Sequence, residues 1–205
     1  MTILQRSEGW FADRCGKVTA SRIKDIGAKP VKGKKYNALT LTILSERITG
    51  VQEETPTSKV MQWGIDQEEN AIAVYENETG NFVKGTGLID HPVIKLSGAS
   101  PDGLVNLDGQ IEVKCPSTAT HLNTLLTKEI PVEYIPQITW QLACTRREWC
   151  DFVSYDPRLP EHLQLVIIRV FTKDLDIAGI EQSVINFNRK LDLIICDLNP
   201  KEVAA

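Results

Sequence analysis

The sequence lacks several features that would assign the protein to a common class. No apolar run within its 205 residues is long enough to cross a membrane and no secretory signal pattern opens it, so we expect no membrane association. The five cysteines are odd in number, scattered and without a C-x-x-C pair, which favours free thiols in a reducing cytoplasm. The three histidines (His91, His121 and His162) show no metal-ligand spacing, and we assign them no role.

The sequence also lacks the basic surplus that nucleic-acid-binding proteins usually carry, since its formal net charge is −4. The basic residues are unevenly distributed, because Lys29, Lys32, Lys34 and Lys35 lie close together in one short segment. This segment is either a solvated charged loop or a place of contact with phosphate groups. With 42% hydrophobic residues, we expect one domain with a full core over residues 1–205.

The hydrophobic pattern predicts an α/β protein. Helices are expected near 8–14, over 37–49, 61–79, 117–127 and 134–144, and from about Asp174 onward. Apolar, β-branched runs predict strands near 82–86, 88–90, 96–99, 150–155 and 165–171. In the helix over 37–49, Leu41, Leu44 and Ile48 form one stripe that is expected to pack on the core.

The segment 100–116 carries the residues with the clearest chemistry. Asp108-Gly109 is a strong turn signal, and a hairpin would bring Asp102 across from the end of the second strand. Glu112 and Lys114 are two apart on that strand, so their side chains leave the same face. Two carboxylates suit a hard cation such as Mg²⁺, and a nearby lysine can orient or deprotonate a water, as phosphodiester hydrolysis requires. A surface hairpin with ordinary charges is the competing interpretation.

Glu68 is a candidate third acid. In the helix over 61–79 it falls on the same stripe as Ile65, Ile72 and Tyr75. A carboxylate on a buried face is unfavourable unless it is paired or bound to metal. The alternative is a shifted register that leaves Glu68 exposed.

A second candidate site lies near the N-terminus. Ser7 is expected to cap a helix on which Trp10 and Arg14 share a face. Arg14 and the hydroxyl groups of Thr19 or Ser21 lie near predicted helix N-termini, a combination that suits anion binding as well as ordinary capping.

Taken in order, these segments resemble the phage lambda exonuclease family, the YqaJ-like viral recombinases of the restriction-endonuclease-like superfamily. The resemblance covers nearly the whole chain. Its matching segments are Trp10-x-x-x-Arg14, Val18-Thr19-Ala20-Ser21, Ala28-Lys29-Pro30-x-x-Gly33-Lys34-Lys35, Trp63-Gly64-x-x-x-Glu68, Ser100-Pro101-Asp102-Gly103-Leu104, Glu112-Val113-Lys114-Cys115-Pro116, Gln137 and Tyr155-Asp156-Pro157-Arg158.

The resemblance implies a restriction-endonuclease-like core, with a central mixed β-sheet flanked by helices. It implies Mg²⁺-dependent 5′→3′ digestion of one strand of linear duplex DNA, which leaves a 3′ single-stranded tail for recombination by strand annealing. Asp102, Glu112 and the Val113 carbonyl would hold the metal, with two ions per site and Mn²⁺ as a substitute. Glu68 would assist through the metal or a water.

The resemblance also implies roles outside the metal site. Lys114 would position the attacking water, and Gln137 would help to fix that lysine or the scissile phosphate. Further residues match DNA contacts: Arg14, Ser21 and Lys35 the pocket for the terminal 5′-phosphate, and Met61 a wedge that splits the end base pair. Where the best-known member has an arginine after Lys-Pro, this chain has Val31 and then Lys32, a candidate DNA contact.

The family implies partners and a location as well. We expect a ring of three subunits on double-stranded DNA ends, beside a single-strand annealing protein, in the cytoplasm of a bacterial host of a phage or prophage. Two other readings compete: another nuclease of the superfamily, such as an endonuclease or an iron–sulfur exonuclease, and a non-catalytic DNA-end-binding protein. An iron–sulfur cluster needs four cysteine ligands, and Cys144 and Cys150 make a poor set. Binding alone does not require Glu112 and Lys114 together.

Overall fold

The computed structural model describes residues 5–52 and 58–198 of the chain. Within them, two sheets form. The smaller has the order β1 (Val18–Thr19), β4 (Ser97–Ala99), β3 (Ile89–Asp90), and the larger has the order β2 (Val83–Lys84), β5 (Gly103–Val105), β6 (Gly109–Lys114), β7 (Trp149–Tyr155), β8 (Leu165–Phe171). All neighbours in the larger sheet are antiparallel except β6 and β7, which are parallel, so the sheet is mixed.

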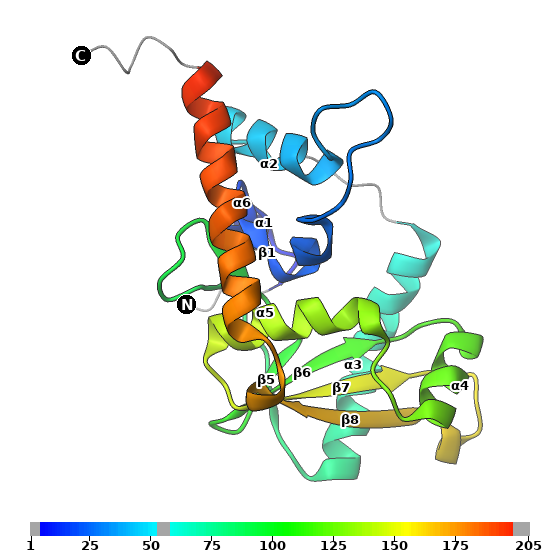
Figure 1. Cartoon of the computed structure of the whole chain (residues 1–205). Helices are drawn as coiled ribbons and strands as arrows, with labels where there is room; N and C mark the ends of the chain where they lie inside the picture. The colour runs from blue at the N-terminus through cyan, green and yellow to red at the C-terminus, as the bar shows by residue number, and fades with distance from the viewer. Residues whose placement is uncertain (1–4, 53–57, 199–205) are drawn as a thin grey trace.

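The helices surround this larger sheet and extend beyond it (Figure 1). They are α1 (Glu8–Arg14), α2 (Ala38–Thr49), α3 (Lys59–Thr79), α4 (Thr118–Thr127), α5 (Ile135–Thr145) and α6 (Ile177–Leu198), with 3-10 turns at Ala20–Asp25, Val132–Tyr134, Glu161–Leu163 and Thr172–Asp174. Figure 1 shows α5 over one face of the five-stranded sheet and α3 behind the other, while α6 rises beside α2. Helices therefore flank the sheet on both faces.

Alternation along β6 decides which side chains meet which helix. Ile111 and Val113 pack with Ala71 and Tyr75 of α3 in one core cluster. The intervening residues of β6 face the other way, towards α5. On the neighbouring strand, Phe152 follows the same rule and packs with residues of α5 in a separate cluster. The α3 side of β6 is thus hydrocarbon, and polar side chains are left for the α5 side.

The hairpin between β5 and β6 is confirmed, but its turn differs from the prediction. Val105 pairs with Gly109, so the loop is Asn106–Asp108 and Gly109 already belongs to β6. The left-handed residue of the loop is Asn106, with φ of 50°. Gly109 serves another purpose: a Cβ there would lie 2.0 Å from the indole ring of Trp149.

Two helices differ from the predicted pattern in which face is buried or where they begin. In α2, Leu44 of the predicted stripe is buried, but Leu41 and Ile48 are exposed and Leu39 and Ile43 are buried instead, so the predicted stripe was wrong at two of its three positions. The helix is oriented instead by Glu46, which is buried and accepts hydrogen bonds of 2.8 and 2.6 Å from the Arg22 guanidinium. Leu39, Ile43 and Glu46 lie at i, i+4 and i+7, so the buried face combines apolar residues with this ion pair. Helix α6 begins at Ile177, because Thr172–Asp174 forms a 3-10 turn.

Candidate active site

The hairpin brings Asp102 beside Glu112. Gly103 lies opposite Ile111, so Asp102 and Glu112 occupy the next positions along the two strands. The backbone N–H of Val113 donates a hydrogen bond of 2.7 Å to Oδ2 of Asp102. Asp102 is therefore anchored to the strand that carries Glu112.

Glu112 is buried beneath α5 and held by three donors. Its side chain is 1% exposed. Oε1 accepts hydrogen bonds from the Lys114 ammonium and, at 2.5 Å, from Nε2 of Gln137. Oε2 accepts a hydrogen bond of 2.5 Å from Nε2 of Gln141. A carboxylate held by three donors, one of them the Lys114 ammonium, has a fixed position and orientation.

Lys114 connects this buried carboxylate to solvent. Its side chain is 25% exposed, and Nζ lies 5.2 Å from the ring centroid of Tyr134. Burial lowers the pKa of Lys114, but the nearby carboxylates of Glu112 and Asp102 raise it by a larger amount, so the pKa of Lys114 lies above its ordinary value. In this arrangement Lys114 is an ammonium at neutral pH, and it acts as a donor rather than a base.

Asp102 has the opposite electrostatic environment. Burial raises its pKa well above the ordinary value, and the negative charges of Glu112 and Glu68 raise it further. Lys114 and the Val113 N–H only partly offset these effects. A carboxylate whose ionised form is so disfavoured is a place where added positive charge would be strongly stabilising.

Glu68 lies on the inner side of α3, in agreement with the predicted register. Its side chain is 20% exposed and contacts the Arg6 guanidinium. Arg6 has a left-handed backbone with φ of 65°, and the preceding Gln5 donates a hydrogen bond of 2.8 Å to the Pro101 carbonyl. Gln5 and Arg6, just before α1, therefore contact the segments that carry Asp102 and Glu68.

The donor set suits a divalent cation. Asp102 and Glu112 supply carboxylate oxygens, the ligands that Mg²⁺ prefers. Burial first, and the nearby negative charge of Glu112 next, raise the pKa of Asp102, so a bound cation would stabilise its ionised form. Within residues 5–52 and 58–198 no three His, Cys, Asp or Glu side chains form a ready metal cluster. Lys114 and Arg6 already pair with the acids. A site of two carboxylates and a main-chain carbonyl is compatible with both observations.

Arg14 lies in a second group of polar side chains, and Trp10 links this group to the segment that carries Asp102. The Arg14 guanidinium donates hydrogen bonds of 3.1 Å to Thr19 Oγ1 and 3.2 Å to Ser21 Oγ, and it lies 4.1 Å from the Trp10 ring centroid. Burial, and next the charge of Arg22, lowers the pKa of Arg14 to about 10. Trp10 Nε1 donates a hydrogen bond of 3.0 Å to Ser100 Oγ, close to Asp102 in the sequence.

Three other predicted contacts lie apart from the acids. Lys35 places its ammonium 5.3 Å from the Tyr36 ring centroid, and Lys32 is exposed in the same loop. Met61 is 50% exposed in the first turn of α3. In the described part of the chain, no hydrogen bond or ion pair links these three residues to Asp102 or Glu112.

Sequence reasoning missed two residues that touch the site. Gln141 binds Glu112 directly, and its spacing of one helical turn from Gln137 was the available signal. Arg6 contacts Glu68 across 62 positions of sequence, and nothing local to either residue indicates that contact.

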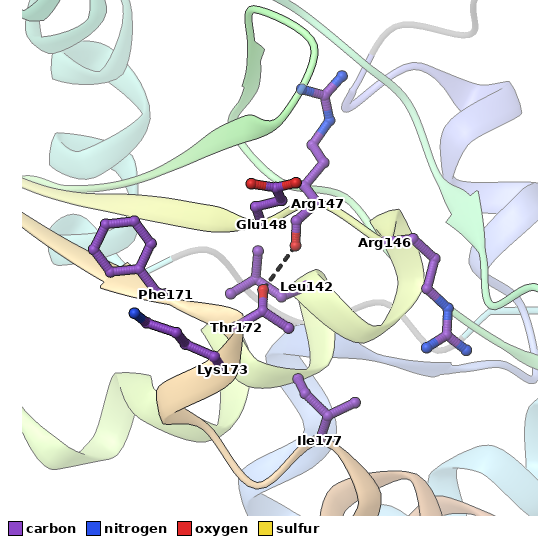
Figure 2. Close-up of a pocket in the computed structure, with 8 residues that line it drawn as sticks. All are labelled: Leu142, Arg146, Arg147, Glu148, Phe171, Thr172, Lys173 and Ile177. Atoms are coloured by element: carbon purple, nitrogen blue, oxygen red, sulfur yellow. Dashed lines mark hydrogen bonds between the residues drawn. The ribbon is translucent and has the colours of Figure 1, made fainter.

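The acid cluster is separate from a cavity of about 550 Å³ at the opposite end of β7 (Figure 2). The arginines at its rim are already used by the fold. Arg147 donates to the carbonyls of Val105, Asn106 and Gly109, and Arg146 pairs with Glu181 at 3.1 Å. Figure 2 shows the guanidinium groups of Arg146 and Arg147 pointing in different directions, so they do not converge on a ligand.

Comparison with known proteins gives the family of the chain. A family model, the YqaJ-like viral recombinase domain, matches residues 9–148. The chain belongs to the YqaJ-like viral recombinase family. This confirms the resemblance found in the sequence. No curated protein matched the chain.

Solved structures support the same family membership. The crystal structure of LHK-Exo in complex with dAMP is 46% identical, with a TM-score of 0.87, and the match covers 96% of this chain and 98% of that chain. The crystal structure of LHK-Exo, an alkaline exonuclease from Laribacter hongkongensis, is 45% identical, with the same TM-score of 0.87 and the same coverage of 96% and 98%. The fold of this YqaJ-like protein is restriction-endonuclease-like, as predicted.

A more distant structure shows the fold alone. The phage-related exonuclease from Haemophilus somnus 129PT is 17% identical, with a TM-score of 0.68 and coverage of 89% of this chain and 96% of that chain. In the part of this YqaJ-like chain that the structure describes, no helix has the length and apolar character needed to cross a membrane.

Proposed function

We propose that the chain is a Mg²⁺-dependent 5′→3′ exonuclease that degrades one strand of linear duplex DNA and leaves a 3′ single-stranded tail. Family membership and the 46% identity to LHK-Exo support a DNA exonuclease. The observation that carries the proposal is the buried Glu112 carboxylate, held by Lys114, Gln137 and Gln141 beside Asp102. A surface hairpin with ordinary charges would not bury and immobilise an acid in this way.

Asp102, Glu112 and the Val113 carbonyl are the groups that would hold the ions. Two ions per site are expected, and Mn²⁺ should replace Mg²⁺. When bound, the metal supplies a polarised phosphate and a water that ionises more readily. The chain supplies two carboxylates and one main-chain carbonyl from a single hairpin, in which the Val113 N–H donates a hydrogen bond of 2.7 Å to Asp102.

Lys114 is the group that would orient the attacking water. It is charged in the environment described above, so it would hold the water oxygen by donating a hydrogen bond and would stabilise the negative charge that develops on the phosphate. Gln137 would keep the acid that partners this lysine in place, since it donates to the same oxygen of Glu112. Glu68 would assist once Arg6 turned to the DNA or to solvent.

Arg14 and Ser21 would bind the terminal 5′-phosphate. Their side chains already meet, and the Trp10–Ser100 hydrogen bond ties their position to the strand end that carries Asp102. A terminal phosphate held there would set which bond reaches the metal. Lys35 would complete this phosphate pocket. Lys32, in the same exposed loop, would contact the DNA backbone, and Met61 would meet the end base pair.

The resemblance to the lambda exonuclease family supports a proposal for the assembly and the partners. We expect three copies of the exonuclease domain, residues 1–205, to form a ring on a double-stranded end. A single-strand annealing protein would take the tail. The setting would be the cytoplasm of a bacterium that carries a phage or prophage. Three copies of the lysine-rich segment 29–35 facing the channel would concentrate positive potential there, even though each chain has a net charge of −4.

Strand-specific labelling tests the activity. Linear duplex carrying a 5′-³²P label should release labelled mononucleotide at once, whereas a 3′ label should stay on a shortening strand. Added EDTA and the variant Glu112→Gln should each stop digestion. Release of the 3′ label first would refute the polarity, and cutting of closed circular DNA would favour the endonuclease. If the protein bound DNA ends but did not digest them in Mg²⁺ or Mn²⁺, the alternative of a non-catalytic DNA-end-binding protein would be favoured.

A further inference from the structure

Gln141 makes a contact with the candidate site that the proposed roles do not use. Its side chain is completely buried, and Nε2 lies 2.5 Å from Oε2 of Glu112. The other carboxylate oxygen, Oε1, is bound by Lys114 and Gln137. The two oxygens of Glu112 are therefore held by different donors, and Gln141 alone holds Oε2 among the described contacts.

A second buried amide stands behind Gln141. Gln110 is also completely buried, and its Nε2 lies 3.4 Å from Oε1 of Gln141. The Thr145 hydroxyl donates a hydrogen bond of 2.8 Å to Oε1 of Gln110. Gln110 and Glu112 share a face of β6, while Gln141 and Thr145 are one turn apart on α5, so the four side chains alternate between strand and helix.

The hydrogen bonds in this chain run in one direction. The amide nitrogen of Gln141 donates to Glu112, and the amide oxygen of Gln141 accepts from the nitrogen of Gln110. Gln110 then presents its nitrogen to Gln141 and its oxygen to Thr145. Each group is oriented by the next, and hydrogen bonds aligned head to tail polarise one another.

Gln141 is an amide side chain in surroundings where an apolar side chain is usual. Its neighbours Ile138 and Leu142 on α5 are fully buried apolar residues, so an apolar side chain would be the ordinary choice at this position. Burying an amide is unfavourable unless all its hydrogen bonds are made. Here the nitrogen and the oxygen of both amides each have a hydrogen-bond partner, and the chain ends on the most buried acid of the candidate site.

We propose that Gln141, oriented by Gln110 and Thr145, is a positioning residue that fixes the Glu112 carboxylate for metal binding. The inference rests on the proposed function, because it assigns Glu112 to the metal. Gln141 acts only through Glu112 and touches neither DNA nor ion. Partners of this kind around metal ligands typically change metal affinity or activity by about 10- to 100-fold.

Metal titration of the full chain without DNA tests the proposal. Gln141→Leu should weaken Mn²⁺ binding measured by calorimetry by about tenfold or more. In DNA digestion it should lower kcat and raise the Mg²⁺ concentration for half-maximal rate, with KM for duplex DNA changed by less than about threefold. Gln141→Met, which is unbranched and equally long, carries the same test if the leucine variant does not fold.

A double-mutant cycle and a control on the same helix separate positioning from packing. Gln110→Leu should have a smaller effect in the same direction, and it should add almost nothing in the Gln141→Leu background. Thr139→Val is the matched control. Thr139 is buried on α5, but among the described residues its hydroxyl donates only to the Ile135 carbonyl of its own helix, so metal affinity should be unchanged.

The outcomes distinguish the two proposals. Parent protein that neither binds Mn²⁺ nor digests DNA would remove the proposed function and the inference with it. Parent protein that does both, beside Gln141 variants with unaltered metal affinity and kcat, would overturn the inference alone. If Gln141→Leu and Thr139→Val lost metal affinity and kcat equally, or if these losses followed the fall in melting temperature, Gln141 would have a packing role. That result would also overturn the inference.

Discussion

Asp156, at the end of β7, should stabilise the fold in a way that depends on pH. Its carboxylate is fully buried and accepts hydrogen bonds of 2.6 and 3.0 Å from the Arg158 side chain. Arg158 also donates a hydrogen bond of 3.0 Å to the Pro116 carbonyl, just after Lys114 and Cys115, and its guanidinium carbon lies 4.8 Å from the Trp63 ring centroid. One carboxylate thus orients an arginine that joins β7, the end of β6 and α3.

The pKa of Asp156 gives the size of the effect. Burial raises this pKa, but hydrogen bonds from Arg158 and Thr118 outweigh burial and lower it from 3.8 to about 2. A shift of close to two units corresponds to at most roughly 2.5 kcal/mol. The Arg158 side chain is 46% exposed, so solvent screening reduces this, and we expect about 1 to 2 kcal/mol.

The substitution Asp156→Asn tests this reasoning. Because the folded pKa lies below the unfolded value, the stabilisation is complete above about pH 5 and is lost as the pH falls towards 2. Urea denaturation of both proteins from pH 2.5 to 7 should therefore give unfolding free energies that differ at pH 7 and converge in acid. The other carboxylates are common to both proteins and cancel. A difference independent of pH would refute the reasoning.

Three further predictions concern the candidate site and the assembly. The cleavage rate should fall by about 10³-fold or more in each of the variants Asp102→Ala, Glu112→Ala and Lys114→Ala, and the effects should combine non-additively. Gel shifts should show that Lys114→Ala still binds DNA ends. Near-normal turnover by Glu112→Ala would contradict the metal assignment. Ends with a 5′-hydroxyl should be digested more slowly than 5′-phosphate ends. Arg14→Ala and Lys35→Ala should each erase most of that preference, and equal parent rates on both ends would rule the pocket out. Light scattering should give a trimer mass, and digestion of long DNA with excess competitor should be processive; a monomer that removes only a few nucleotides would defeat the ring.

Local rules were sufficient where the signal lay within one element. The period of two places Glu112 and Lys114 on one face, and the helical period places Glu68 on the inner side of α3. Both follow from geometry that tertiary packing does not change. The ranges predicted for these two helices also end where glycine follows, because Gly50 and Gly80 take left-handed conformations with φ of 69° after α2 and α3.

Prediction failed where contacts between elements decide the outcome. Which face of α2 is buried depends on the Arg22–Glu46 ion pair, and Arg22 lies on a different element. That Gln141 reaches Glu112 depends on how α5 lies across β6, and that Arg6 reaches Glu68 depends on the path of the chain before α1. No periodicity within a segment carries such information, because it depends on the relative placement of two elements.

The missing side chain of Gly109 has a consequence at the far end of its strand. Gly109 pairs with Trp149, and a Cβ at that position would meet three atoms of the indole within 2.3 Å. If β6 slid by one residue against β7, Asp108 or Gln110 would be pressed against that ring, where there is no room. The indole therefore fixes the register of β6 against β7. Since sliding by one residue would also turn Glu112 away from α5 and replace it with an aliphatic side chain, the position of the acid is set three residues away.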